Sequence, residues 1–230
     1  VYAGPDNRPA DYSPENRPYK AEKFLKISLG GYDEGDFAMI MGFPGSTQRY
    51  MTSYEIDRLL EVENPQRIFI RGERQAILKE DMVRIQYASK YAQSSNYWKN
   101  SIGKSRGIRR LDVKGRKQEQ EAAFTAWAAK NTLPTEGYSN ALNLIRESVE
   151  EMAPYFASSQ YLSEAIGRSV EILVPARLAV SKKGGELTEA LKAFYKDYNM
   201  PTDRRVAKRM FRIVGENCKE LPSVFAEVIG

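Results

Sequence analysis

The sequence predicts a mainly α-helical protein with a short β segment at its N-terminus. Apolar residues recur at a period near two up to about residue 51, and at a helical period beyond it. The chain has 230 residues, 42% of them hydrophobic, which is enough to bury a substantial core. We therefore expect two domains, a loop with strands over residues 1–51 and a helical domain over residues 52–230.

The N-terminal domain begins with an irregular segment. Residues 1–20 hold four of the eleven prolines among Asp, Asn, Arg and Tyr residues, which favours a surface loop. Two strands are predicted after it, over residues 24–29 and over residues 37–41, the latter an uninterrupted apolar run. Glycines and acidic residues between the two strands provide turns.

The second domain is predicted as a series of amphipathic helices. Thr52 or Ser53 can cap a short helix that runs to Leu60. Longer apolar faces at helical spacing cover residues 77–92 and a stretch that ends before Pro154. Further helices are predicted over residues 122–129, 162–173 and 187–194, and from Pro201 onward, where Val206, Met210 and Ile213 form the apolar face of a basic helix.

Composition excludes several kinds of site within this chain. There is no histidine, which rules out a Ser-His-Asp or Cys-His triad and a histidine-ligated zinc. The single Cys218 rules out an internal disulfide and a multi-cysteine metal site. No apolar run approaches the roughly 18 residues that a membrane span needs. We predict no metal, no cofactor and no membrane span.

A basic stretch over residues 99–117 is one candidate binding surface. It contains eight Lys or Arg residues against Asp112 alone, and it follows Tyr97 and Trp98. Nucleic acid could use such a patch, with cations on phosphates and aromatic rings on bases. Glycines interrupt any single helical stripe, so a solvated face, or one paired with acidic helices of the same protein, is the favoured interpretation.

A second candidate is a serine activated by a lysine. Ser101 and Lys104 match an S-x-x-K pattern, and the segments 94–96 and 183–185 loosely match its two companion motifs. The order of the motifs is reversed, however, and Gly103 weakens the helix that the serine should open. A chance match is therefore favoured.

Asn96, Trp98 and Asn100 form the most unusual local cluster. If the preceding helix continues, the two asparagines fall on one face, and their carbonyl oxygens could accept hydrogen bonds from a cationic amine beside the indole. The alternative is a helix C-terminus at which asparagine caps and tryptophan packs.

Three segments together resemble a known family. They are GFPGSTQRY at residues 42–50, NYWKNSIG at residues 96–103 and RRLDV at residues 109–113. The strands predicted before them resemble the end of the first barrel of trypsin-like serine peptidases. In this order the segments look like the serine dipeptidyl peptidases of Gram-negative bacteria that include dipeptidyl peptidases 7 and 11. The similarity covers most of the chain and is specific through about residue 130.

The resemblance implies a chymotrypsin-like double barrel with a helical cap over its Ser-His-Asp triad, which releases dipeptides from free peptide N-termini. Residues 1–51 would end the first barrel, and residues 52–230 would form much of the cap. The catalytic His and Asp would then precede Val1 and the serine would follow Gly230. The chain opens without a methionine or an apolar leader, as expected of a piece, and alone it is predicted to be inactive.

The family also implies a site and partners. An asparagine of the cap helps to hold the substrate amine, and the matching segment places this role on Asn100, with Asn96 as the alternative and Trp98 beside them. The expected partners are peptides with free N-termini, the rest of the same polypeptide and a second copy of the chain, but no nucleic acid. The expected location is the periplasm or cell surface. A helical module for nucleic-acid or protein binding is the alternative function.

Overall fold

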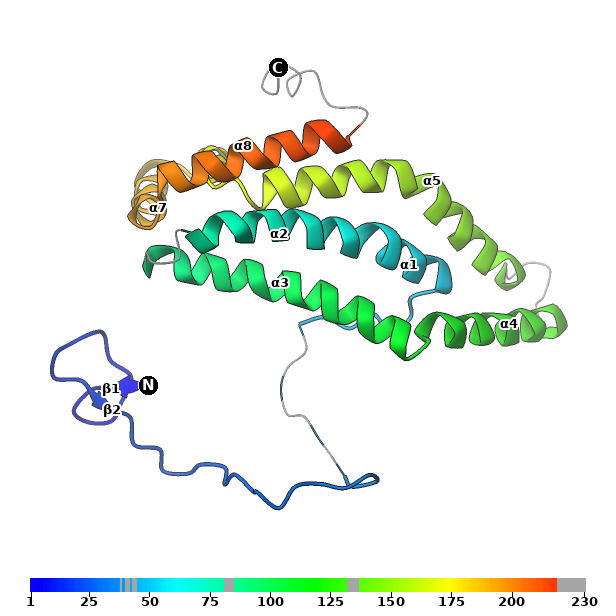
Figure 1. The fold of residues 1–230 in the computed structure, drawn as a ribbon, viewed down its shortest axis with the longest axis horizontal. Coiled ribbons are helices and arrows are strands. Elements are labelled where there is room, and N and C mark those ends of the chain that lie inside the picture. The colour runs from blue at the N-terminus through cyan, green and yellow to red at the C-terminus, as the bar shows by residue number, and fades with distance from the viewer. Residues whose placement is uncertain (38, 40–41, 43–44, 81–84, 132–136, 219–230) are drawn as a thin grey trace. The chain divides into compact units, whose positions relative to one another are not determined.

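A computed structural model describes residues 1–37, 39, 42, 45–80, 85–131 and 137–218 of the chain. The chain divides into two compact units, Val1–Thr47 and Gln48–Gly230, and each is described by itself. The described part of the second unit is helical, as predicted (Figure 1). No helix among the described residues is long and apolar enough to cross a membrane.

The first unit contains one small antiparallel ladder. Strand β1 (Tyr2–Ala3) pairs with β2 (Arg17–Pro18), so the predicted proline-rich loop contains both strands. The connection between them is held by Asn7, whose Nδ2 donates to the carbonyl of Lys20 at 2.9 Å and whose Oδ1 accepts from its N–H at 2.8 Å. This two-way bond closes the loop.

The two strands predicted from the apolar runs differ from what the structure shows. Residues 24–29 form no strand, and their apolar side chains are exposed, Leu29 to 94%. Phe37 and Met39 also lie outside any strand, while Ala38, Ile40 and Met41 lie outside the described residues. A strand depends on hydrogen bonds to a neighbour. Among the described residues of this unit, the ladder between β1 and β2 is the only one that forms.

Over its described residues, the second unit is a series of helices. Three short elements interrupt the series, two of them π-helical and one a 3-10 turn. In chain order the elements are α1 (Ser53–Arg58), η1 (Leu59–Glu63), α2 (Asn64–Glu80), α3 (Ile85–Arg110), α4 (Val113–Asn131), η2 (Tyr138–Asn140), α5 (Ala141–Tyr161), η3 (Leu162–Gly167), α6 (Leu173–Ser181), α7 (Gly184–Lys196) and α8 (Met200–Asn217).

Helix α1 begins with a capping box, which selects Thr52 from the two predicted caps. The Thr52 hydroxyl accepts from the N–H of Glu55 at 3.4 Å, and the Glu55 carboxylate accepts from the N–H of Thr52 at 2.8 Å. Ser53 is used differently, since its N–H and hydroxyl both donate to the Glu121 carboxylate of α4 at 2.6 Å. The start of α1 is thereby tied to α4.

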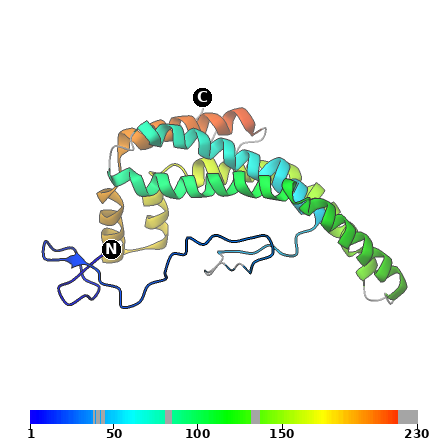
Figure 2. The same ribbon diagram turned by 60° about the horizontal axis from the view of Figure 1, so that its bottom comes forward.

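The face predicted over residues 77–92 belongs to two helices. Residue 80 ends α2, residue 85 begins α3, and residues 81–84 lie outside the described residues. Because helical spacing continues on both sides of this interval, periodicity alone cannot distinguish one helix from two. The two helices pack side by side along their length (Figures 1 and 2).

Prolines modify two of the later helices. Pro154 lies inside α5, where it donates no backbone hydrogen bond, and Figure 1 shows that α5 bends along its length. Pro175 lies in the first turn of α6, a position where its missing N–H has no intrahelical partner to lose. Helices α6 and α7 form a hairpin that runs across the direction of α2, α3 and α8 (Figure 2).

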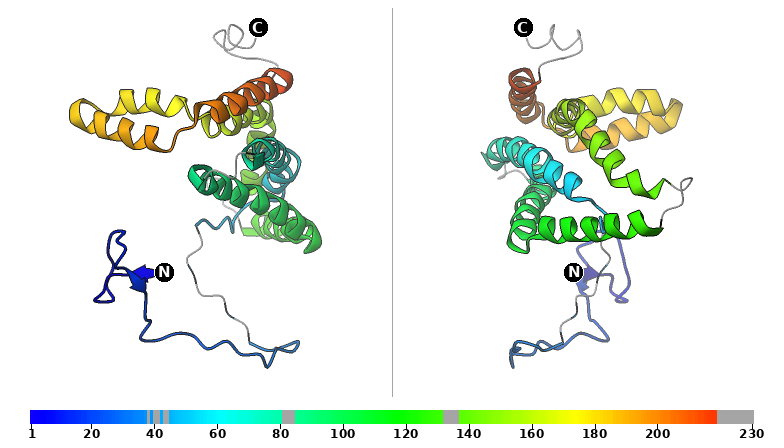
Figure 3. Two further views of the ribbon diagram at one scale, coloured as in Figure 1. Left: turned by 60° about the vertical axis from the view of Figure 1, so that its left-hand side comes forward. Right: turned by 90° about the vertical axis from the view of Figure 1, so that its right-hand side faces the viewer.

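The core of this unit forms around α8, which Figure 3 shows from two sides. Val206, Met210 and Ile213 are each at most 2% exposed, which confirms the apolar face predicted for this helix. Complete burial of such a side chain contributes about 1.5–3 kcal/mol. The remaining members of the buried cluster come mainly from α2, α3 and η3: Ile70, Leu78, Tyr87, Ala165, Ile166, Val170, Val214 and Cys218.

Candidate functional site

Asn96 and Asn100 lie within α3, which continues to Arg110, and not at a helix end. Both side chains are exposed. Residues four apart on a helix have Cβ atoms about 5–6 Å apart on one face. The two amide groups can therefore approach the same ligand from the solvent side of α3.

Trp98 lies on another side of the same helix. Two residues correspond to a rotation of about 200°, so Trp98 is nearly opposite both asparagines. Its indole Nε1 donates to the carbonyl of Ile68 on α2 at 3.0 Å. The indole N–H is thus used between the helices, and a direct role for Trp98 in amine binding stays a prediction.

The outer face of α3 stays open beyond the asparagines. Gly103 and Gly107 follow Asn100 at helical spacing on this face, and a Cβ built at either glycine would meet no described atom within 4 Å beyond the adjacent residues and the backbone of α3 itself. The inner face differs, because Ser94, Ser101 and Ser105 are at most 6% exposed. One helix therefore separates an open surface from a buried seam.

The seam between α2 and α3 is polar. The Asn64 amide donates to the Ser105 hydroxyl at 2.9 Å, and Arg67 reaches the Ser101 hydroxyl at 3.5 Å. Together with the bond from Trp98 to Ile68, these contacts hold the two helices at several levels. Hydrogen bonds satisfy groups that would otherwise be costly to bury. The seam thus sets where α3 presents Asn96 and Asn100.

A cluster of arginines surrounds one buried carboxylate near this seam. Glu164 of η3 is 4% exposed and lies 2.7 Å from Arg71, 3.3 Å from Arg67 and 3.8 Å from Arg168. The Arg71 guanidinium also lies 4.7 Å from the centre of the Tyr97 ring. Burial lowers the pKa of Arg71 from its ordinary value, although the Glu164 carboxylate opposes this effect.

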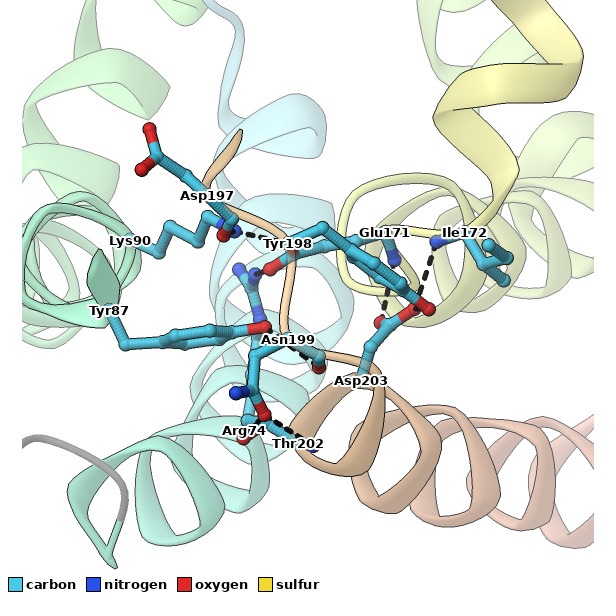
Figure 4. A network of polar contacts seen from close by, with 10 residues as sticks. All are labelled: Arg74, Tyr87, Lys90, Glu171, Ile172, Asp197, Tyr198, Asn199, Thr202 and Asp203. Atoms are coloured by element: carbon cyan, nitrogen blue, oxygen red, sulfur yellow. Dashed lines mark hydrogen bonds and ion pairs between the residues drawn. The ribbon is translucent and has the colours of Figure 1, made fainter. Parts of the chain in front are cut away.

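A second network joins α3, α6 and α8 (Figure 4). The Asp203 carboxylate accepts from the backbone N–H groups of Glu171 and Ile172 at 2.8 and 2.9 Å, at the start of α6. The Tyr198 hydroxyl donates to the same carboxylate at 3.2 Å. Lys90 lies 2.5 Å from Glu171. Burial, followed by the charge of Asp203, raises the pKa of Tyr198 to about 12.

Neither network was predicted from the sequence. Glu164 meets Arg71 across 93 positions of the chain, and Asp203 meets Glu171 across 32. Such pairs leave no local pattern, since charged residues on helices are usually solvated. The available signal was an acidic residue within an apolar stretch, as at Glu164 between Leu162 and Ala165.

The basic stretch over residues 99–117 contacts its own chain at several points. Lys114 pairs with Asp57 at 2.8 Å and Arg109 with Glu61 at 3.6 Å. Lys117 donates to the carbonyl of Arg49 at 2.9 Å. These contacts agree with the prediction of a face that is partly paired within the protein.

The S-x-x-K residues have separate partners. Ser101 is 1% exposed and faces Arg67, whereas the exposed Lys104 donates to Gln48 at 2.9 Å. Gly184 belongs to the segment 183–185, which loosely matches a companion motif of S-x-x-K. It begins α7 with a φ of 55°, a conformation that favours glycine. The motif therefore has a structural explanation. Among the described residues there is no group of His, Cys, Asp or Glu side chains that could hold a metal ion.

Comparison with known proteins relates the chain to peptidases. The family model described as Peptidase S46 matches residues 1–223. The chain is 43% identical to Dipeptidyl-peptidase 7 of Porphyromonas gingivalis over 241 residues, which cover 100% of this chain and 34% of the relative. It is 33% identical to the Asp/Glu-specific dipeptidyl-peptidase of Flavobacterium psychrophilum, covering 91% of this chain and 32% of that protein.

Solved structures agree with this relationship. DPP11 of Porphyromonas endodontalis, in complex with the dipeptide Arg-Asp, matches with a TM-score of 0.69 and 29% identity, over 95% of this chain and 33% of the other. Its complex with Arg-Glu matches with a TM-score of 0.67. The chain therefore spans about a third of the length of the proteins that it matches.

Proposed function

Because this chain belongs to the peptidase S46 family, we propose that it is the helical cap, with the end of the first barrel, of a serine-type dipeptidyl aminopeptidase. The single observation that carries the proposal is the family match over residues 1–223. The two relatives reported above are named dipeptidyl-peptidases, and the two solved structures reported above hold dipeptides. The substrates would be peptides with free N-termini, cleaved after the second residue.

The cap would contribute the amine site through Asn100, with Asn96 beside it. A peptide ammonium group carries three N–H donors, and an asparagine carbonyl accepts without adding a titrating charge. The exposure of both amides on one face of α3 supports this role. Trp98 would act from the other side of α3, by holding the helix against Ile68 of α2.

The catalytic residues would come from the rest of the polypeptide. The chain has no histidine, so it cannot form a Ser-His-Asp triad alone, and the isolated chain would be inactive. By the same family argument, a periplasmic or cell-surface location and a homodimer are proposed. Nucleic-acid binding through residues 99–117 has less support, because several of its cations contact the chain itself.

Steady-state kinetics of the full-length enzyme test the amine site. Asn100→Ala should lower kcat/KM for a dipeptidyl substrate by about tenfold or more, since a hydrogen bond to a charged group contributes about 1.5–3 kcal/mol. The matched control is Gln118→Ala, which removes an exposed amide from α4. A substrate whose amine is acetylated should show no difference between the wild type and Asn100→Ala.

The Asn96→Ala variant decides between the two asparagines. A larger loss in Asn96→Ala than in Asn100→Ala would transfer the role to Asn96. If both variants kept wild-type kcat/KM on the free-amine substrate, the proposed amine site would be wrong. Failure of the full-length enzyme to release dipeptides would overturn the function itself.

A further inference from the structure

A cavity of about 240 Å³ opens between α2, α3 and the residues that follow η3. This is room for roughly eight water molecules at ~30 Å³ each. Every side chain that lines it carries a polar group, and three are arginines: Arg71, Arg74, Gln93, Ser94, Tyr97 and Arg168. We call it the arginine cavity.

Two buried lining residues have polar atoms without a hydrogen-bond partner. Arg74 is 8% exposed and Ser94 is 1% exposed. Within the described part of the chain, neither Arg74 Nε nor Ser94 Oγ has a hydrogen-bond partner. Buried polar groups are nearly always paired in native proteins, with protein atoms, water or a ligand. Two such groups on the lining of one polar cavity therefore indicate an occupant that supplies acceptors.

The charges around the arginine cavity are unbalanced. Among the residues that the structure describes, Glu164 is the one carboxylate within 4 Å of the guanidinium groups of Arg67, Arg71 and Arg168. Arg74 lies 3.9 Å from Glu171, whose carboxylate is closer to Lys90, at 2.5 Å. Five cations therefore share two carboxylates.

Asp203 does not restore the balance. Its charge acts on Arg74, and including it still leaves five cations against three carboxylates among the described residues of this region. Its oxygens accept hydrogen bonds from two backbone N–H groups and from Tyr198. Burial lowers the pKa of Arg74, as expected of a cation that lacks full compensation. An added negative charge would therefore be stabilised here.

We propose that the arginine cavity binds a small oxyanion, either a phosphate or a carboxylate, held by Arg74, Ser94 and Arg168. A guanidinium presents paired N–H donors that match the oxygens of both groups, and a hydroxyl adds one more donor. Gln93, Tyr97 and Arg168 are exposed at the rim, so an anion can enter from solvent. The inference is independent of the amine site, because no asparagine of that site lines the cavity.

Isothermal titration calorimetry of the full-length enzyme tests this proposal. Inorganic phosphate is the titrant in one arm and acetate in the other. A bulky organic buffer salt keeps the ionic strength constant. One saturable site per chain is expected. Arg74→Gln should weaken binding by about tenfold or more, because a hydrogen bond to a charged group is lost. Ser94→Ala should weaken it less, with unchanged melting temperature, since this hydroxyl has no protein partner to lose.

The control is Arg110→Gln, which removes one exposed charge at the end of α3 and should bind as the wild type does. Saturation by phosphate alone would identify a phosphate site, and saturation by acetate alone a carboxylate site. Absence of saturable binding in both arms would overturn the proposal. So would wild-type affinity in Ser94→Ala and Arg168→Gln, which remain informative if Arg74→Gln does not fold.

Discussion

Arg71 of α2 and Glu164 of η3 form a buried ion pair, with Nη2 2.7 Å from Oε2 and side-chain exposed fractions of 6% and 5%. A second bond joins Arg71 Nε to the same carboxylate oxygen at 2.9 Å. The backbone carbonyl of Glu164 also accepts from the hydroxyl of Ser169 at 2.8 Å. The pair therefore connects the helix that packs against α3 with the segment that follows α5.

Neutralising this carboxylate should destabilise the fold. Glu164→Gln removes the negative charge that compensates the arginines around it. Because breaking a buried ion pair is strongly destabilising, the free energy of unfolding should fall by about 3–5 kcal/mol. Urea unfolding followed by circular dichroism measures the change. The matched control is Glu189→Gln in the exposed pair with Lys192, which should change stability by less than about 1 kcal/mol. Similar losses in the two variants would contradict the expectation.

Removing the Asp203 carboxylate should loosen the start of α6. Asp203→Ala leaves the N–H groups of Glu171 and Ile172 without their acceptor. We therefore expect the free energy of unfolding to fall by about 2 kcal/mol or more. Asp203→Asn keeps one acceptor oxygen and should lose less. Thermal unfolding measures both. An equal loss in Asp197→Ala, which changes an exposed side chain, would show that the effect is unspecific.

The tyrosine of this network predicts a pH dependence. Burial and Asp203 raise the pKa of Tyr198 to about 12 from an ordinary value of 10.0, so the folded state holds the phenol proton more tightly. The resulting stability is complete below about pH 10 and is lost as the pH rises towards 12. Urea midpoints measured from pH 9 to 11 should therefore fall less steeply in Tyr198→Phe than in the wild type. Parallel slopes would refute this, and Tyr155→Phe, at an exposed tyrosine, is the control.

The bond from Trp98 to Ile68 can be separated from ligand binding. Trp98→Phe keeps an aromatic ring and loses the N–H donor. The free energy of unfolding should therefore fall by about 1 kcal/mol. In the full-length enzyme KM should change much less than in Asn100→Ala. A rise in KM equal to that of Asn100→Ala, at unchanged stability, would show instead that the indole contacts the substrate.

Local sequence patterns predicted the positions of several helices of this unit. The stretch expected to end before Pro154 continues to Tyr161, however, and the helix expected over residues 162–173 ends at Gly167, before α6 begins at Leu173. The capping residues around Thr52 and the spacing of Val206, Met210 and Ile213 act within a few residues, so their structural meaning is visible in the sequence. The strand predicted over residues 24–29 did not form, because pairing depends on a neighbour that no local pattern specifies.

The candidate sites divide in the same way. Asn96 and Asn100 could be proposed from the sequence because they fall on one face if the helix continues, and α3 does continue through them. The arginine cavity could not, since Arg74, Ser94 and Arg168 come from three separate segments that only the packing brings together. Their charges looked like those of ordinary solvated helix faces.

The seam between α2 and α3 also restricts the alternatives open to the folding chain. Apolar contacts are non-directional, so apolar residues alone specify the alignment of two helices less strictly than hydrogen bonds do. A slide of one turn, about 5.4 Å, would separate Asn64 from Ser105 and Trp98 from Ile68 at the same time. The first separation would leave buried polar groups unpaired and the second would leave half-buried ones. The polar contacts of the seam therefore specify one register between α2 and α3 and disfavour registers shifted by one turn.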